Sequence, residues 1–256
     1  MQWKCSRVAI LVAMLCLLVA GCEKAPGDFF QGYVEGEFVY VSSPLAGTVQ
    51  KLSVSRGDQV QAGQPLFALD ETMEKAAREQ AQAAFTMAEA DFKREEQLFR
   101  QGPAAAQDFD RARSTRDQDR EQLAQAQWNL EQMKQAAPQP GLVFDTLFRE
   151  GEWVAAGKPI VMLLPPPNIK VRAFVPESEI GPLRVGQEAR VMVDGVNEPF
   201  PGKISYISQR AEYTPPVIFS RESRSKLVFL VEIHFPPASA AKLHPGQPVD
   251  VEFVRQ

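Results

Sequence analysis

An internal repeat is the feature of this 256-residue sequence that most constrains its fold. Each copy spans about 23 residues of short apolar segments broken by glycine turns, which is too little to bury a core alone. The copies are therefore predicted to pack on each other as halves of one small β-sandwich. Eight positions recur at one offset of 94 residues, which turn usage alone does not explain: Pro44, Gly47, Val49, Gly57, Val60, Gly63, Pro65 and Leu66 match Pro138, Gly141, Val143, Gly151, Val154, Gly157, Pro159 and Ile160.

The segment between the two copies has helical character. It is rich in Ala, Glu, Gln, Arg and Met from Glu71 to Arg100, where it contains no Gly or Pro. Phenylalanine recurs every seven residues, at Phe85, Phe92 and Phe99, before Gly102-Pro103 interrupts the helix. A second run then keeps the three-four spacing of a heptad seam until Pro138, with Phe109, Ala112, Arg116, Asp119, Leu123, Ala126, Leu130 and Met133.

Two such seams joined by a short Gln-Gly-Pro-Ala tip predict an antiparallel coiled-coil hairpin over residues 71–137. At the rise of an α-helix, each arm reaches roughly 45 to 50 Å. A helical domain folded back on the body is the alternative. The narrow, Ala-rich seam favours the projecting hairpin, because it is too thin to build a globular core.

From residue 169 onward, apolar residues alternate with period two, as in Ile169, Val171, Ala173 and Val175. Later segments show the same alternation in short runs, and turn signals such as Asp194-Gly195 and Pro245-Gly246 separate them. This pattern predicts a small antiparallel β-barrel over residues 169–256. Within it, helical periodicity is limited to residues 176–183, and residues 213–226 are predicted to form an exposed loop.

The N-terminal segment is a predicted signal peptide, residues 1–21. Lys4 and Arg7 precede a thirteen-residue apolar run, which is shorter than the roughly 20 residues that span a bilayer. The run ends in Leu18-Val19-Ala20-Gly21-Cys22, which resembles a lipoprotein signal peptidase site and implies acylation of Cys22. An uncleaved anchor with a buried Cys is the alternative. Residues 22–42 are then expected to form a tether and a first strand.

Composition excludes several classes of function. The 28 Lys and Arg are outnumbered by 32 Asp and Glu, so the charge expected of a nucleic-acid binder is missing. With two His and three Cys, there is little material for a metal site or a Cys/His nucleophile pair. We expect no catalytic residues, no metal and no cofactor. The isolated His234 and His244 fit this expectation, and the candidates for an envelope hydrolase are better interpreted as turn and cap residues: Asp58, Asp70, Glu177 and Glu179.

Together these features resemble the HlyD-type membrane fusion proteins, the periplasmic adaptor subunits of bacterial efflux pumps. The resemblance implies a mixed fold of β-structure and coiled coil: a lipoyl-like β-sandwich, with halves at 43–70 and 138–168, split by an antiparallel α-helical hairpin and followed by the small β-barrel. It covers nearly all of the chain after residue 21. The segments that carry it are 43–49, 57–66, 151–160, 175–180, 185–187 and 243–247.

The resemblance also implies partners. Members that dock on the outer-membrane channel TolC carry Arg, Leu and Ser near the hairpin tip, spaced by four and then seven residues. Here Arg94 and Leu98 are in register, Gly102 lies at the tip, and the third position is Ala105, which has no hydroxyl to offer. Arg94 is equally compatible with an ordinary solvated surface charge. A TolC-like channel is the expected partner at the tip.

At the other end, an inner-membrane exporter is implied. Residues 214–224 look most like those of adaptors that serve ABC-type exporters, and the short C-terminal extension after the last expected strand favours the same class. Tyr213, Arg221 and Arg224 are the expected transporter contacts. The resemblance further implies a homo-oligomeric ring, lipid-anchored in the periplasm at the inner membrane of a Gram-negative bacterium, with efflux of drugs or other small molecules as its role.

The same half-repeats also suggest a biotin- or lipoyl-type carrier domain of an enzyme complex. Such carriers present a modified Lys at the turn that joins their halves. Here the hairpin replaces that turn, and the nearest candidate, Lys75, lies inside a predicted helix. The adaptor is therefore the preferred interpretation.

Overall fold

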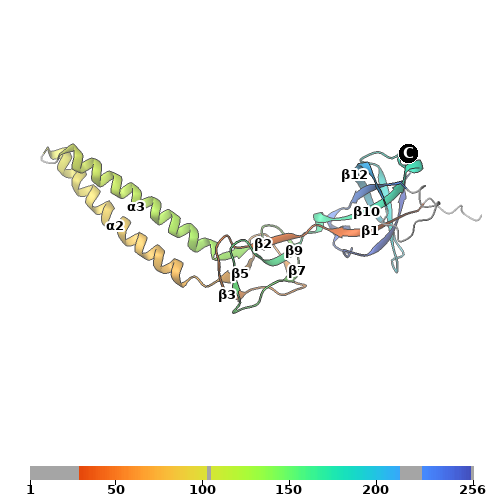
Figure 1. Cartoon of the computed structure of the whole chain (residues 1–256), viewed down its shortest axis with the longest axis horizontal. Helices are drawn as coiled ribbons and strands as arrows, with labels where there is room; N and C mark the ends of the chain where they lie inside the picture. Colours follow the sequence, from red (N-terminus) through yellow and green to blue (C-terminus); the bar gives the residue numbers. More distant parts are fainter. Residues whose placement is uncertain (1–28, 103–104, 214–226, 255–256) are drawn as a thin grey trace, which may run out of the picture. The chain divides into compact units, whose positions relative to one another are not determined.

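The computed structural model describes residues 29–102, 105–213 and 227–254, which form two compact units (Figure 1). One unit comprises residues 36–169 and contains the sandwich and the hairpin. The other contains the chain up to Glu35 and from Lys170 onward and forms the barrel.

The sandwich consists of two four-stranded sheets, with strand orders β2-β9-β7-β4 and β6-β5-β3-β8. Each sheet takes two strands from each half of the repeat, and the offset of 94 residues maps one sheet onto the other. The two halves are therefore interleaved, as the repeat predicts. The strands are β2 Val39–Ser42, β3 Gly47–Leu52, β4 Gln59–Val60 and β5 Pro65–Leu69, then β6 Lys134–Ala136, β7 Gly141–Thr146, β8 Trp153–Val154 and β9 Pro159–Leu164.

Matched residues of the two halves play matched structural roles. Leu66 and Ile160 are both fully buried and belong to one hydrophobic core. Gly57 and Gly151 both adopt a left-handed backbone, with φ of 95° and 87°, at equivalent turns. A side chain is strained in this conformation, so the turn requires glycine in each copy.

The structure extends each half of the repeat by one strand. These are β2, which lies within the predicted tether and first strand, and β6, which lies at the end of the predicted hairpin. The helical run was predicted to continue to Pro138, but it ends at Gln132 and Lys134–Ala136 forms β6. Pairing with β5 is the reason: Pro65 lies opposite Ala136 in this ladder, and Leu69 N–H donates to Met133 O at 2.8 Å. Met133 is buried in the sandwich core, so tertiary packing overrides the helical pattern here.

The hairpin consists of α2, Thr72–Gln101, and α3, Ala106–Gln132, which lie side by side along their length (Figure 1). Thirty residues make α2 about 45 Å long. The predicted seam is confirmed for its seven residues on α3, from Phe109 to Leu130, which are all buried or partly buried, whereas the eighth, Met133, lies beyond the helix in the sandwich core. On α2 the same spacing is followed inward by Ala81, Phe85, Ala88 and Phe92.

The second unit is a closed six-stranded barrel with the strand order β1-β10-β13-β12-β11-β14. The barrel is not confined to the predicted residues 169–256, because β1, Phe30–Gly36, completes it by pairing with β14. Ile204 is buried in the barrel, but a register shift between Ile204 and Tyr206 interrupts the alternation and leaves Tyr206 exposed. The remaining strands are β10 Ile169–Pro176, β11 Glu188–Val193, β12 Phe200–Tyr213, β13 Leu227–His234 and β14 Pro248–Phe253.

Short helices complete the described chain. The predicted helical turn after residue 176 is present as α4, Glu177–Ile180. A further turn, α5 at Pro237–Ala240, was not predicted, and a 3₁₀ turn, η1 at Pro166–Asn168, precedes β10.

Because the two halves share one core, truncating either copy of a matched pair should have the same effect. We expect Leu66→Ala and Ile160→Ala each to lower the free energy of unfolding by about 2–5 kcal/mol. The double variant should deviate from the sum of the two, since both cavities open in one core. Denaturant unfolding followed by tryptophan fluorescence measures this, because Trp128 and Trp153 belong to this unit.

Leu147→Ala is the control: Leu147 is 44% exposed, so a loss below about 1 kcal/mol is expected. A mild effect of Ile160→Ala beside a severe effect of Leu66→Ala would contradict the shared core.

Candidate docking site at the hairpin tip

The tip is formed where α2 ends and α3 begins. Gly102 ends α2 with a φ of 93°, and its N–H donates to Phe99 O at 3.1 Å. Ala105 precedes α3 in an extended conformation and provides no side-chain cap. Residues 103 and 104, between them, lie outside the described part of the chain. The left-handed glycine thus ends one helix, and the extended Ala105 starts the next.

A cluster of aromatic rings joins the two helices just below the tip. Phe99 stacks on Phe109 with ring centroids 5.1 Å apart, and Phe92 lies 5.5 Å from the same ring. The guanidinium of Arg116 sits 4.1 Å above the Phe92 ring, which adds a cation–π contact. The heptad spacing predicted the positions of these residues in the seams. It did not predict the stack, because spacing within each helix does not give the register between them.

The four predicted docking residues are all exposed. Arg94 and Leu98 lie four residues apart, so they share one face of α2. Gly102 and Ala105 end one helix and start the other. Leu98 is 37% exposed and does not belong to the buried seam, so its side chain is available to a partner.

Arg94 is held by a neighbour on its own helix. Its Nη1 lies 3.1 Å from Asp91 Oδ1, and both side chains are largely exposed. This is the geometry of a solvated surface pair, which contributes only about 0.3–0.5 kcal/mol to the helix. The pair is weak enough for Arg94 to exchange Asp91 for an acceptor on a partner.

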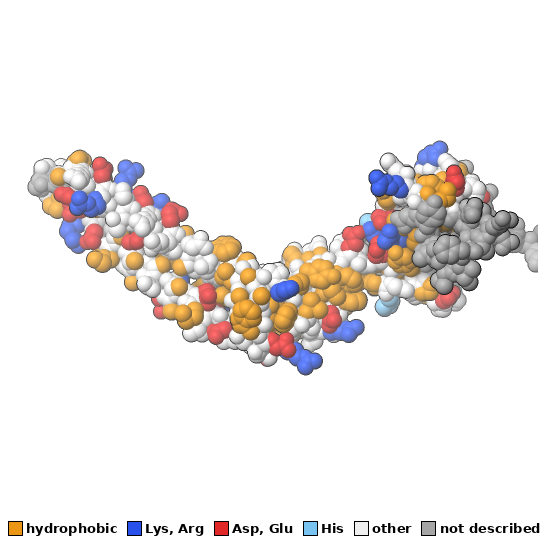
Figure 2. Space-filling model, in the orientation of Figure 1, with side chains coloured by type: hydrophobic (Ala, Val, Ile, Leu, Met, Phe, Trp, Pro, Cys, Tyr) orange, Lys and Arg blue, Asp and Glu red, His pale blue; other side chains and the backbone are white. Residues whose placement is uncertain are grey.

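The helices near the tip carry charges of both signs (Figure 2). Arg100 lies 2.7 Å from Glu96, Lys93 lies 3.0 Å from Glu89, and Arg111 lies 3.5 Å from Asp108. These pairs balance each other locally. The described part of the tip therefore carries no strong net charge, and Leu98 is exposed beside these pairs.

The base of the hairpin is fixed by a different set of contacts. Glu71 accepts from Lys75 on α2 and from Lys134 on β6, the latter at 2.9 Å. These two hydrogen bonds to the lysines lower the pKa of the Glu71 carboxyl below its usual value. Ser43 adds a hydrogen bond of 3.1 Å from its hydroxyl to Gln132 O, at the last residue of α3. Both helices are thus bound to the sandwich where they leave it.

Several predicted sites fall outside the described chain. Cys22, Arg221 and Arg224 lie in the segments that the structure does not describe. Tyr213 is the last residue of β12, and its side chain is likewise not described. The proposed lipid anchor and transporter contacts therefore stay predictions.

The residues of the alternative functions have structural roles. Lys75 is in the first turn of α2 and pairs with Glu71, so it is not presented at an exposed turn as a carrier lysine would be. Asp58 Oδ2 accepts from Ser55 N–H at 2.8 Å, as a turn residue does. Asp70 Oδ1 accepts from both the N–H and the hydroxyl of Thr72, and these bonds lower the pKa of Asp70.

The described residues provide neither a cluster of metal ligands nor a membrane-spanning helix. No group of three or more His, Cys, Asp or Glu residues there could hold a metal ion. Within the same residues, none of the helices has both the length and the apolar character that crossing a membrane requires.

Comparison with known proteins identifies the hairpin and the architecture. Residues 70–141 match the family model described as the YBHG alpha-helical hairpin domain. A UPF0194 membrane protein of Citrobacter koseri is 26% identical, over 96% of this chain and 96% of its own length.

Two solved structures share the fold. A chimeric MacA-MexA protein, which contains the Pseudomonas aeruginosa MexA alpha-hairpin domain, gives a TM-score of 0.74 at 20% identity, over 89% of this chain and 81% of that one. The membrane fusion protein Spr0693 of Streptococcus pneumoniae gives 0.69 at 22% identity, over 89% and 99%. The predicted fold class and the resemblance to membrane fusion proteins are both confirmed, and neither comparison favours a carrier domain.

The Glu71 contacts predict a pH-dependent term in stability. Because the folded pKa of Glu71 is lowered, its contribution is fully present above the unfolded pKa, near 4.5, and is lost as the pH falls through the folded pKa. We expect Glu71→Gln to lower the unfolding midpoint at pH 7, with a difference from wild type that shrinks toward pH 3. Thermal unfolding followed by tryptophan fluorescence measures this. Glu74→Gln, in the same helical turn, is the matched control, and a pH-independent difference for Glu71→Gln would refute the carboxylate's role.

Proposed function

We propose that this chain is the periplasmic adaptor of an efflux assembly, which links an inner-membrane exporter of the ABC type to a TolC-like outer-membrane channel. The observation that carries the proposal is the hairpin itself: about 45 Å of paired helix, bound at its base to a sandwich whose fold is that of membrane fusion proteins. Such an element suits a mechanical link between two partners. In this proposal the hairpin makes and breaks no covalent bonds.

The hairpin tip is the proposed contact with the outer-membrane channel. The exposed Leu98 supports this assignment, because it offers an apolar side chain beside a ring cluster that holds the two helices together. Arg94 is proposed to exchange Asp91 for an acceptor on the channel. Ala105 provides no hydroxyl, so at that position the contact is one of shape alone.

The barrel unit and the N-terminal segment are proposed to meet the exporter and the membrane. Acylated Cys22 would anchor the chain to the inner membrane, with Tyr213, Arg221 and Arg224 facing the exporter. The sequence of residues 214–224 supports the ABC-type assignment through its resemblance to adaptors of that class.

Several copies are proposed to form a ring, because one narrow hairpin cannot enclose a conduit. The sandwich offers apolar surface for such packing: Figure 2 shows hydrophobic side chains gathered over it. Its large exposed apolar residues are Trp153 at 65%, Tyr40 at 57% and Leu147. Exposed aromatic residues of this size are typical of surfaces that bind other proteins.

A charge at Leu98 tests the tip. We expect Leu98→Glu to reduce crosslinking between the tip and the outer-membrane channel about tenfold, which corresponds to about 1.4 kcal/mol, and to raise drug susceptibility in cells that depend on this assembly. The physical reason is that the glutamate must be desolvated at an apolar contact.

Met87→Glu is the control for this variant, because Met87 is an exposed apolar residue on the same helix, 11 positions before Leu98. It should leave crosslinking at the tip within twofold of wild type. Unchanged crosslinking and susceptibility for Leu98→Glu would remove the tip from the mechanism.

Ala105 allows a gain of function to be tested. Ser and Asp both cap a helix from this position, so Ala105→Ser and Ala105→Asp should each stabilise α3 by about 0.5–2 kcal/mol. Only Ser adds the hydroxyl that the family pattern carries. We expect Ala105→Ser to raise crosslinking to a TolC-like channel and Ala105→Asp not to do so. Equal crosslinking for the two variants would show that the cap, not the hydroxyl, is responsible.

A further inference from the structure

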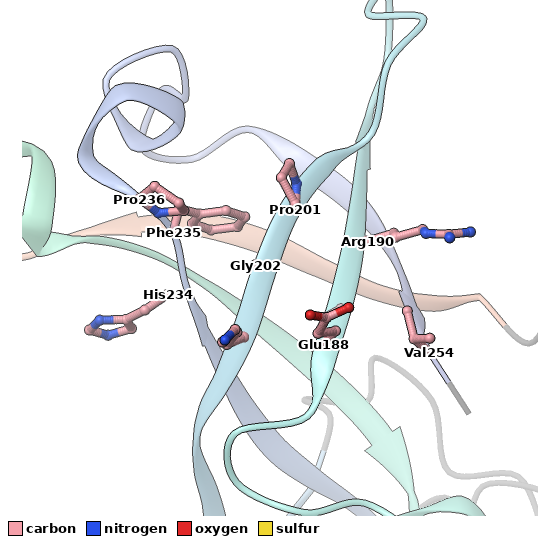
Figure 3. A pocket seen from close by; sticks show the side chains of 10 residues that line it. Glu188, Arg190, Pro201, Gly202, His234, Phe235, Pro236 and Val254 are labelled. Atoms are coloured by element: carbon pink, nitrogen blue, oxygen red, sulfur yellow. The ribbon is translucent and has the colours of Figure 1, made fainter. Parts of the chain in front are cut away.

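The barrel unit carries a pocket that the adaptor function does not use. It has a volume of about 430 Å³ and lies across the neighbouring strands β11, β12 and β13, near the point where β13 ends (Figure 3). Pockets of about 300–1,000 Å³ are the size that holds drug-like molecules. The chain therefore has room there for one small organic ligand.

The centre of the pocket is apolar. In Figure 3, the strand with Pro201 and Gly202 runs between Phe235 and Pro236 on one side and Arg190 and Glu188 on the other. Gly202 is buried, and a Cβ added there would come within 2.5 Å of Ile233 Cγ2 and 3.0 Å of Phe235 Cε1. The strand therefore passes close to the Phe235 ring without a side chain between them. Phe235 is itself largely buried, so the exposed apolar surface of the pocket comes mainly from Pro201 and Pro236.

The charged groups of the pocket are predominantly basic. The lining holds two cationic side chains, Lys203 and Arg190, one histidine, His234, and a single carboxylate, Glu188. Glu188 and Lys203 lie directly opposite each other on β11 and β12. Among the described residues, however, no ion pair within 4 Å joins these two, whereas Arg190 lies 3.9 Å from Glu252. The ammonium group of Lys203 is thus available beside an apolar surface, in a chain whose net charge is −4.

We propose that this pocket binds an amphipathic organic anion, a molecule with an aromatic or aliphatic body and one carboxylate or sulfonate group. The body lies on Pro201 and Pro236, where Phe235 also lines the pocket, and the anionic group contacts Lys203. Arg190 adds positive potential at the rim, and Glu188 opposes binding by like-charge repulsion. The site lies within the barrel and does not depend on docking at the hairpin tip, so its test is independent of the proposed adaptor function.

Two fluorescent probes separate the charge from the apolar body. 1-Anilinonaphthalene-8-sulfonate is an aromatic sulfonate, and N-phenyl-1-naphthylamine has the same rings without the sulfonate. In titrations of the chain from residue 22 onward, at low salt, we expect saturable binding of the sulfonate at one site. This binding should be about three- to tenfold tighter than binding of the neutral probe.

Substitutions locate the site. Lys203→Gln should weaken binding of the sulfonate about three- to tenfold and change binding of the neutral probe less than twofold. Glu188→Gln should strengthen binding of the sulfonate, because it removes the opposing charge. Lys51→Gln, an exposed lysine on β3 of the other unit, is the matched control and should change neither affinity. Circular dichroism of each variant verifies that the barrel is folded.

Three results would overturn the proposal. Equal affinity for the two probes would show that no anion subsite exists. Sulfonate binding that is unchanged in both Lys203→Gln and Glu188→Gln would place the probe at another apolar surface, such as that around Trp153. Tighter binding of a cationic amphiphile than of the sulfonate, weakened by Glu188→Gln, would reverse the proposed charge preference.

Discussion

Neither half of the repeat can keep its apolar residues from water without the other. Leu66 and Ile160 occupy equivalent positions in one core, and both sheets of the sandwich contain strands from both halves. This mutual burial brings β5 and β6 side by side, although 64 residues separate the end of the first from the start of the second. The chain that leaves the sandwich at Asp70 must therefore return beside it at Met133, and the hairpin follows from that closure.

The contacts along the hairpin differ from its base to its tip. Glu71 and Ser43 bind the base to the sandwich, and a heptad seam continues outward from there. The seam includes polar residues, Arg116 and Asp119, where a coiled coil usually places apolar ones. Arg116 is accommodated by the face of Phe92, and the stack of Phe99 on Phe109 binds the helices near the tip. Because α2 and α3 are held together near the tip and bound to the sandwich at the base, the hairpin can fix the position of its tip relative to the sandwich.

Much of this architecture was predictable, because it rests on periodic signals. The offset of 94 residues predicted the sandwich, the three-four spacing predicted the seam of α3, and period two predicted most strands of the barrel. Other features were not predictable, because non-local pairing decides them. Lys134–Ala136 carries a helical pattern but pairs with β5, and Phe30–Gly36 joins a barrel whose other strands begin at residue 169. The pocket around Gly202 has no motif, since residues from separate strands form it.

The positions where α2 and α3 join the sandwich have an evolutionary consequence. Since α2 begins after β5 and α3 ends before β6, and these two strands are paired, whole heptads can be inserted or removed on both arms together while β5 and β6 keep their register. Each such step changes the reach by about 10 Å. The length of the hairpin can thus change in one dimension while the sandwich at its base stays as it is.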